Sequence, residues 1–249
     1  MEGKKSVWIQ GLTGKMGQEL KLAIESSETL KLVGGSNKLT DLDLGFNNAS
    51  ILLDFSSKSG NSGLYEILKK NSEKSKLILI GTTGLNSETI QKWKFLAESA
   101  DHKILYAQNT SVGVFLTLQA ALHIAPACKL NRYDIEIEET HHRSKIDSPS
   151  GTALRYAEAL SNKLNFSAIF SRSRNRQANE IGVQATRGGG VFGEHKIRFL
   201  GDDDEICISH RAFSRSLFTK GAIHLLDYLD KQKPGHLYSL KKLKTDDFC

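Results

Sequence analysis

The densest group of side chains suited to chemistry lies between residues 138 and 153 of this 249-residue chain. It holds two adjacent histidines, His141 and His142, followed closely by Arg143 and Lys145. Imidazoles exchange protons near neutral pH, and clustered cations suit a carboxylate ligand. The segment therefore predicts a site that binds an acidic small molecule and transfers a proton.

The end of the same segment predicts a second contact for an anion. Ser150, Gly151 and Thr152 stand where a helix is expected to begin, and backbone amides and the positive end of a helix dipole favour a negative charge there. Together with the cations they would grip a small dicarboxylate from two sides. A solvated loop and a metal site are the alternatives. Adjacent histidines without a clearly placed third ligand are weak evidence for zinc, so no metal is expected.

A glycine-rich run at residues 11–17, Gly-Leu-Thr-Gly-Lys-Met-Gly, lies between a predicted strand and a predicted helix. Glycines let the backbone approach a pyrophosphate, and the helix N-terminus favours its charge. The GxxGxxG spacing is looser than GxGxxG, and a tight strand-to-helix turn is the alternative. Its position between the two elements favours a dinucleotide.

Two further loops, 81–84 and 107–110, follow the fourth and fifth predicted strands. Both stand at carboxyl ends of parallel strands, where doubly wound sheets bind their ligands.

No acidic residue follows the second strand to hold an NAD ribose. Lys38 either meets the 2′-phosphate of NADPH or is an exposed loop lysine, so NADPH and NADH both stay open as cofactors.

The first 110 residues alternate short β-rich runs with amphipathic helical patterns, which is typical of βαβ units. This predicts an α/β protein with a Rossmann-type doubly wound parallel sheet. The strands are expected at 6–10, 51–55, 77–80 and 103–107, with a further strand, the second in the chain, that ends near residue 33.

Beyond residue 111 the pattern changes to a long helix at 114–124, a half-exposed strand at 134–139, a loop and another helix. Three more strands are expected at 181–186, 195–200 and 205–209, followed by a last helix from Ser214 to about Lys231. Their clustering predicts a mixed or antiparallel sheet, and hence a second domain of α+β type.

The composition, 39% hydrophobic and 25% charged, is that of a globular protein. The apolar stretch 112–127 is interrupted by polar residues and is expected to be too short and too polar for a bilayer. The first residues lack the apolar core of a secretory signal, so a cytoplasmic protein is expected. Three cysteines without CxxC spacing indicate neither a disulfide framework nor zinc.

A net charge of +6 does not choose among nucleic acid, membrane surface and small anions. The one dense basic stretch, Arg172, Arg174 and Arg176, is interpreted as a solvated loop, so no nucleic-acid partner is expected. The residues 187–190 (an arginine and three glycines) and 193–195 (Gly-Glu-His) are interpreted as a flexible polar segment that forms a lid or a subunit contact.

Taken together, these segments resemble the 4-hydroxy-tetrahydrodipicolinate reductase (dihydrodipicolinate reductase) family of bacterial lysine and diaminopimelate biosynthesis. The most specific element is 141–153, which is similar to the family's HHxxKxDAPSGTA pattern. The runs 11–17, 81–84, 109–114, 193–195 and 210–215 support it. The chain departs from the family pattern at Ser148 (usually Ala), Lys15 (usually Arg) and Thr110 (usually Met or Phe).

The resemblance implies a cofactor domain formed by 1–111 and 214–249, and a substrate-binding and tetramerisation domain formed by 112–213. It implies a homotetramer that reduces 4-hydroxy-tetrahydrodipicolinate to tetrahydrodipicolinate and water with NADPH or NADH. By position, His141 would donate or accept the proton, and Lys145 would be a second proton donor and a carboxylate binder. His142, Gly151 and Thr152 would contact the substrate. The implied cofactor contacts are Gly11, Leu12, Thr13, Gly14, Lys15, Met16, Asn37, Lys38, Gly81, Thr82, Thr83, Ala107, Gln108, Asn109 and Thr110.

Two other functions are compatible with parts of the sequence. One is another two-domain NAD(P)-dependent oxidoreductase, such as an amino-acid dehydrogenase. The other is a module that senses a dinucleotide or binds nucleic acid without turnover. The second alternative leaves the histidine-rich segment unexplained.

Overall fold

A computed structural model describes residues 3–36, 47–70, 75–240 and 243. The chain forms two compact units. Unit 1 comprises Met1–Ser111 and Ser216–Cys249, and unit 2 comprises Val112–Arg215. Two of the expected cofactor contacts, Asn37 and Lys38, lie outside the described residues.

Unit 1 is built on a parallel sheet whose strand order is β11-β5-β4-β3-β1-β2 in the part of the chain that the structure describes. The doubly wound prediction is therefore confirmed. The sequence analysis missed β11 and ended β2 about three residues early. The strands are β1 (Lys5–Gln10), β2 (Leu30–Ser36), β3 (Ile51–Asp54), β4 (Leu77–Ile80), β5 (Lys103–Tyr106) and β11 (His236–Ser239).

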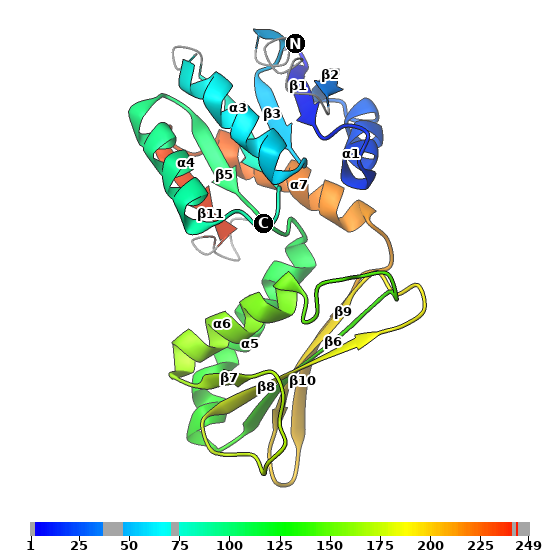
Figure 1. The fold of residues 1–249 in the computed structure, drawn as a ribbon, viewed down its shortest axis with the longest axis vertical. Coiled ribbons are helices and arrows are strands. Elements are labelled where there is room, and N and C mark those ends of the chain that lie inside the picture. Colours follow the sequence, from blue (N-terminus) through cyan, green and yellow to red (C-terminus); the bar gives the residue numbers. More distant parts are fainter. Residues whose placement is uncertain (1–2, 37–46, 71–74, 241–242, 244–249) are drawn as a thin grey trace. The chain divides into compact units, whose positions relative to one another are not determined.

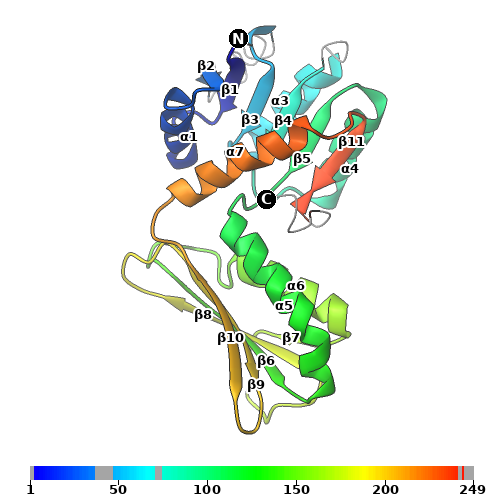
Figure 2. The same ribbon diagram turned by 180° about the vertical axis from the view of Figure 1, so that it is seen from behind.

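Helices cover both faces of this sheet, as Figures 1 and 2 show. Helices α1 (Lys15–Glu25) and α7 (Ser216–Asp230) lie on one face, and α3 (Lys58–Lys70) and α4 (Ser87–Ser99) lie on the other. The last helix begins at Ser216 rather than at Ser214. Apolar residues at helical spacing bury α3 and α4 against the strands; this core includes Leu64, Leu68, Trp93 and Leu96 with Leu52 and Ile78.

Unit 2 is a mixed sheet of order β10-β9-β6-β8-β7 with helices α5 (Val112–Leu130) and α6 (Gly151–Leu164) on one face. Strand β6 pairs parallel with β8 and antiparallel with β9. The expected α+β domain is thus present. Its strands are β6 (Asp134–His141), β7 (Ser167–Ile169), β8 (Glu180–Arg187), β9 (Glu194–Leu200) and β10 (Glu205–Arg211).

Strand β6 alternates strictly between the two faces of the sheet. Ile135, Ile137, Glu139 and His141 are buried on the helix-covered face, whereas Glu138 and the other even-numbered positions are only half-buried or exposed. Strands place successive side chains on opposite faces, so alternate residues of β6 point into the core and toward the surface. Two polar residues at the end of β6 therefore point inward.

Helix α5 passes the length and composition test for a membrane span, with a mean hydropathy of 1.3 over its most apolar 18 residues. The helix continues three residues beyond the apolar stretch 112–127 considered in the sequence analysis, and this added length lets it pass the test. Its packing gives another reason for the apolar composition, since Val114, Leu118, Ala121 and Ala125 are buried in the core of unit 2. Apolar residues around a helix also fit a buried core helix.

The arginine-rich loop before β8 is not simply solvated, contrary to the interpretation from sequence. Arg172 contacts Glu136 at 3.0 Å and Arg176 contacts Asp134 at 2.7 Å, both on β6. Arg174 pairs with Glu180 at the start of β8. These ion pairs fasten the loop to β6 and β8, two adjacent inner strands of the sheet, and so give the basic run a structural role.

Candidate active site

In unit 1 the glycine loop is shaped by close backbone packing. Gly11 has φ +90°, and a Cβ on it would stand 2.5 Å from the Phe55 carbonyl oxygen. A Cβ on Gly17 would stand 2.2 Å from the Gly11 carbonyl oxygen. Both positions therefore exclude a side chain, and α1 packs directly on the loop.

The start of α1 is open for an anion. Thr13, Gly14 and Lys15 are exposed, the N-cap Gly14 makes no side-chain cap hydrogen bond, and the first turn holds no acidic residue. Strand β1 lies between β2 and β3, so the loop sits where the strand order reverses. Doubly wound sheets bind dinucleotides at this point, and the loop fits a pyrophosphate.

The other expected cofactor loops follow neighbouring strands at the same edge of the sheet. Thr82 donates its amide to the Asp54 carbonyl at 3.1 Å, while Thr83 is exposed. A Cβ on Gly81 would collide with the Phe55 ring at 2.3 Å. The structure thus gathers the residues 11–16, 81–83 and 107–110 at the carboxyl edge of one sheet.

Thr110, which departs from the family pattern, has a specific contact. Its buried hydroxyl donates a hydrogen bond of 2.6 Å to the Phe218 carbonyl of α7. The bond links the loop after β5 to the last helix, although more than a hundred residues separate them. Where the family pattern usually has Met or Phe, this chain therefore has a side chain that is held by a hydrogen bond.

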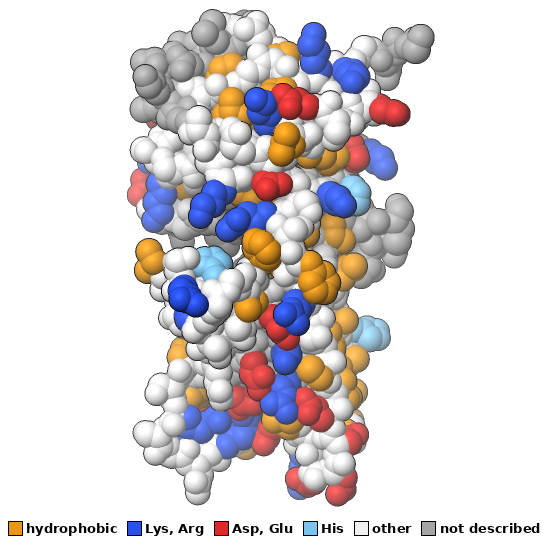
Figure 3. Space-filling model, turned by 90° about the vertical axis from the view of Figure 1, so that its right-hand side faces the viewer, with side chains coloured by type: hydrophobic (Ala, Val, Ile, Leu, Met, Phe, Trp, Pro, Cys, Tyr) orange, Lys and Arg blue, Asp and Glu red, His pale blue; other side chains and the backbone are white. Residues whose placement is uncertain are grey.

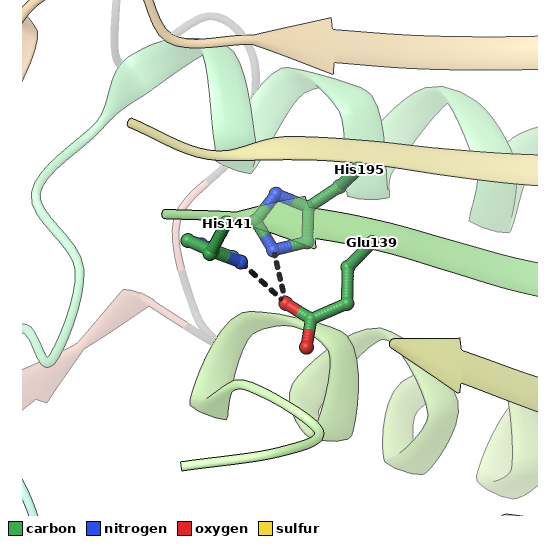
Figure 4. A group of neighbouring side chains, drawn as sticks. All are labelled: Glu139, His141 and His195. Carbon is green, nitrogen blue, oxygen red and sulfur yellow. Dashed lines mark ion pairs between the residues drawn. The ribbon is translucent and has the colours of Figure 1, made fainter. Parts of the chain in front are cut away.

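In unit 2 three side chains from two strands converge on one point, shown in Figure 4. Glu139 Oε2 lies 2.7 Å from His141 Nδ1 and 3.7 Å from His195 Nε2. The His141 and His195 rings meet edge-on at 5.1 Å. All three residues are buried. The register makes this meeting possible, because Glu139 on β6 is directly opposite His195 on β9.

Ser150 and Arg187 complete the group around the carboxylate. Glu139 Oε1 accepts the Ser150 amide at 2.8 Å and the Arg187 guanidinium at 2.8 Å. Ser150 also caps α6, accepting from the Ala153 amide at 3.3 Å. Its hydroxyl lies 3.1 Å from His195 Nε2. The cap and the carboxylate thus hold each other in place.

The site keeps a charged carboxylate beside a neutral imidazole. Burial raises the pKa of Glu139, but His141, Ser150 and Arg187 together lower it to about 2. Burial, aided by repulsion from His141, lowers the pKa of His195 to about 3. At neutral pH Glu139 is ionised and His195 is uncharged.

The remaining predicted residues lie on the loop between β6 and α6. Lys145 Nζ pairs with Asp147 at 2.7 Å, and His142 Nδ1 lies 2.9 Å from the Ser144 hydroxyl. Gly151, the first residue of α6, is exposed. Unit 2 therefore brings His141, His142, Lys145 and the α6 N-terminus onto one connected stretch beside the Glu139 cluster.

Sequence reasoning missed Glu139, Arg187 and His195 as members of this site. His195 was interpreted as part of a flexible segment, but it is a buried residue of β9. The period-two pattern of Ile135 and Ile137 already places Glu139 on the inner face. The partner strands of β6 were not predictable, so nothing in the sequence located His195 or Arg187 beside it.

Glu139, His141 and His195 offer three ligand atoms within 4.8 Å of one another, the spacing of a metal site. The donor set does not favour a cation. Glu139 Oε1 is already bound by the Arg187 guanidinium, and Lys145 lies on the adjoining loop. Positive side chains oppose a divalent ion at this point, and the carboxylate is more readily explained as a partner of the imidazole.

A doubly wound sheet with a phosphate-type glycine loop, joined to a unit that carries a carboxylate–imidazole pair, defines the class of two-domain Rossmann-type oxidoreductases. Family models narrow this class. The model described as dihydrodipicolinate reductase, N-terminus, matches residues 5–110, and the model for the C-terminus matches residues 113–243. The chain belongs to the dihydrodipicolinate reductase family.

Individual relatives agree with this assignment. The chain is 37% identical to a 4-hydroxy-tetrahydrodipicolinate reductase of Rickettsia rickettsii over 96% of its own length and 98% of the relative. It is 32% identical to the 4-hydroxy-tetrahydrodipicolinate reductase of Clostridium novyi over 94% of its own length and 96% of the relative. A dipicolinate-bound dihydrodipicolinate reductase from Paenisporosarcina sp. TG-14 shares the fold, with a TM-score of 0.77 and 22% identity. The match covers 97% of this chain and 100% of that structure.

Proposed function

We propose that this protein reduces 4-hydroxy-tetrahydrodipicolinate to tetrahydrodipicolinate and water with NADPH or NADH as the reductant. The observation that supports this most directly is the stretch from His141 to Thr152, where a carboxylate-bound imidazole, an ammonium group and a helix N-terminus follow one another. The family assignment and the nucleotide-type loop of unit 1 agree with it.

Unit 2 would hold the two carboxylates of the substrate. Lys145 and His142 offer positive charge or a hydrogen bond to one carboxylate, and the amides of Gly151 and Thr152 at the start of α6 receive the other. Lys145 pairs with Asp147 in this structure, so a substrate carboxylate would compete for the ammonium. Holding the ring at two ends contributes several kcal/mol through orientation, roughly within the range known for proximity effects.

His141 would supply the proton of the reaction. Residues 11–16, 81–83 and 107–110 would hold the reduced nicotinamide cofactor, which when bound would supply the hydride for the conjugated imine that forms as the substrate loses water. The resulting enamine then needs one proton, which His141 would deliver, so that hydride and proton together complete the reduction. A positioned general acid contributes about 10²- to 10⁴-fold in rate.

A coupled assay tests the proposal. Pyruvate and aspartate semialdehyde would be condensed by the synthase of the preceding step, and oxidation of NADPH or NADH would be followed after this protein is added. We expect oxidation that depends on the condensation product. Oxidation with simple keto or amino acids instead would support an amino-acid dehydrogenase, and cofactor binding without turnover would refute an enzyme of either kind.

The assembly that we propose is a homotetramer formed through the open face of the unit 2 sheet. Acidic and basic side chains are interspersed on the surface of this unit, as Figure 3 shows. Arg198 on β9 joins Glu138 on β6 and Glu205 on β10 at 2.7 Å and 2.6 Å. A face that carries both signs of charge can meet a second copy of itself in a symmetric contact. Sedimentation equilibrium would give four times the chain mass, and a monomer would overturn this. A cytoplasmic location is proposed with it.

A further inference from the structure

We propose that Glu139 is a positioning residue, which orients the His141 ring and stabilises its protonated form. The inference rests on the proposed function, because it assigns Glu139 a task in the proton transfer of that reaction. The two oxygens of this buried carboxylate are used differently, and that difference supports the assignment.

Each oxygen of Glu139 has its own partners. Oε1 accepts the Ser150 amide and the Arg187 guanidinium, both at 2.8 Å. This anchors the carboxylate and directs Oε2 to His141 Nδ1 at 2.7 Å. A ring held from Nδ1 presents Nε2 on its other side, and the orientation of the imidazole is set by the carboxylate.

The surroundings of Nε2 fit a group that must meet a substrate. Nε2 faces Gly193, where a Cβ would stand 3.0 Å from it. Glycine at this position leaves the space next to the nitrogen unfilled, and the His141 side chain keeps an exposed fraction of 9%. Nδ1 is thus engaged by Glu139, while Nε2 is the nitrogen left to deliver a proton.

The charge on Glu139, like its position, suits a partner of the His141 ring. Its pKa of about 2 keeps the carboxylate ionised through the range in which a histidine titrates, although burial opposes this. The ionised Oε2 lies 2.7 Å from Nδ1, where it can accept a charge-assisted hydrogen bond from a proton on that nitrogen. The same logic explains how a buried carboxylate supports the histidine of a hydrolase triad.

Other ionisable groups around His141 do not replace this carboxylate. His195 on β9 is uncharged at neutral pH, and Arg187 on β8 is bound to the far oxygen of Glu139. Lys145 and Asp147 on the following loop form their own pair, and burial lowers the pKa of His210 on β10. Among these groups, the ionised carboxylate in direct contact with His141 is Glu139.

The matched test compares Glu139→Gln with Glu138→Gln. Glu138 is the next residue on β6, but it faces the other side of the sheet and pairs with Arg198. For Glu139→Gln we expect kcat to fall about 10- to 100-fold. The pH at which kcat/KM declines on the alkaline side should move down by about one unit, because the imidazolium loses its anion. Glu138→Gln should keep the wild-type pH profile, and sedimentation equilibrium would check that it keeps the wild-type assembly, since Glu138 lies on the proposed contact face.

Two further measurements separate positioning from simple damage to the fold. Glu139→Asp keeps the charge and should restore the alkaline limb toward the wild-type pH even if kcat stays low. The double variant Glu139→Gln with Arg187→Met leaves no unpaired guanidinium and should keep the wild-type unfolding temperature, yet show the same shifted limb. Nitrogen NMR of His141 should report Nδ1–H in the wild type.

The possible failures are distinguishable. If the wild-type protein does not oxidise NADPH or NADH with the condensation product, the proposed function is wrong. If it does, and Glu139→Gln and the double variant are folded but keep the wild-type kcat and pH profile, the positioning role is overturned. An Nε2–H tautomer of neutral His141 would overturn it as well, independently of activity.

Discussion

At the scale of single residues, the chemistry of this protein is concentrated in a short stretch that combines a buried imidazole with a more exposed ammonium. His141 is held by Glu139, whereas Lys145 pairs with Asp147, whose own side chain is 56% exposed. A buried, fixed group suits proton transfer, and a more mobile cation suits capture of a carboxylate. Replacing His141 should therefore change mainly kcat, and replacing Lys145 should change mainly the KM for the substrate.

Replacement of His141 by Gln should reduce kcat strongly and leave the cofactor affinity nearly intact. The reduction should be about 10²- to 10⁴-fold, because the amide cannot donate a proton as an acid does. Fluorescence titration with NADPH and NADH would check the cofactor affinity. A His141→Gln variant with wild-type kcat would remove His141 from the reaction.

Replacement of Lys145 by Ala should raise KM for the substrate, since the variant lacks the ammonium that one carboxylate would pair with. The loss should be about tenfold or more, in keeping with a hydrogen bond to a charged group. Initial rates over a range of substrate concentrations measure it, with KM for the cofactor as the control. An unchanged substrate KM would refute the assigned contact.

At the scale of elements, the two sites depend on how backbone segments approach one another. In unit 1, α1 reaches the glycine loop closely enough to exclude a side chain at Gly17. In unit 2, the register of β6 with β9 brings Glu139 opposite His195, and the N-cap of α6 closes the cluster. A change in either arrangement moves several functional groups at once.

Gly17→Ala tests the arrangement in unit 1. A Cβ there would stand 2.2 Å from the Gly11 carbonyl oxygen, so loop and helix must separate. We expect stability to fall by about 1–3 kcal/mol, as for overpacked sites, and cofactor affinity to fall with it. Gly190→Ala is the control, because a Cβ on Gly190 would meet no atom within 4 Å. Urea unfolding and cofactor titration would measure both effects, and equal behaviour of the two variants would contradict the packing argument.

At the scale of the whole molecule, the buried charges of unit 2 couple its stability to pH. The pKa of His195 falls from an ordinary 6.5 to about 3 in the folded protein. Below about pH 6.5 the unfolded chain therefore binds a proton that the folded chain does not bind, and stability falls as the pH drops toward 3. Glu139, with a pKa lowered from 4.5 to about 2, adds to the loss only below about pH 4.5.

Urea unfolding between about pH 7 and pH 4.5 should show this dependence, and His195→Gln should weaken it, since the glutamine does not titrate. His224→Gln is the matched control, because it removes an exposed histidine of α7 rather than a buried one. If the slope is the same in both variants, His195 is not the group responsible.

Much of unit 1 was predictable because its signals are local. Each buried parallel strand is a short apolar run, each helix has its own period, and the glycine loop is contiguous in the chain. Strand β11 was missed because four residues without strong alternation carry little information, and its partner β5 lies more than 130 residues earlier. Pairing partners of that kind are decided by tertiary packing.

The sequence by itself determined the types of group available for catalysis and their order along the chain, because a loop such as 141–152 keeps neighbours together in any fold. Only the tertiary structure decided that Glu139, His195 and Arg187 surround His141, because strand register and strand order bring together residues about fifty positions apart. Burial in that shared space then set their charge states, which no pattern of residue types could do, since pKa values depend on the atoms that replace water.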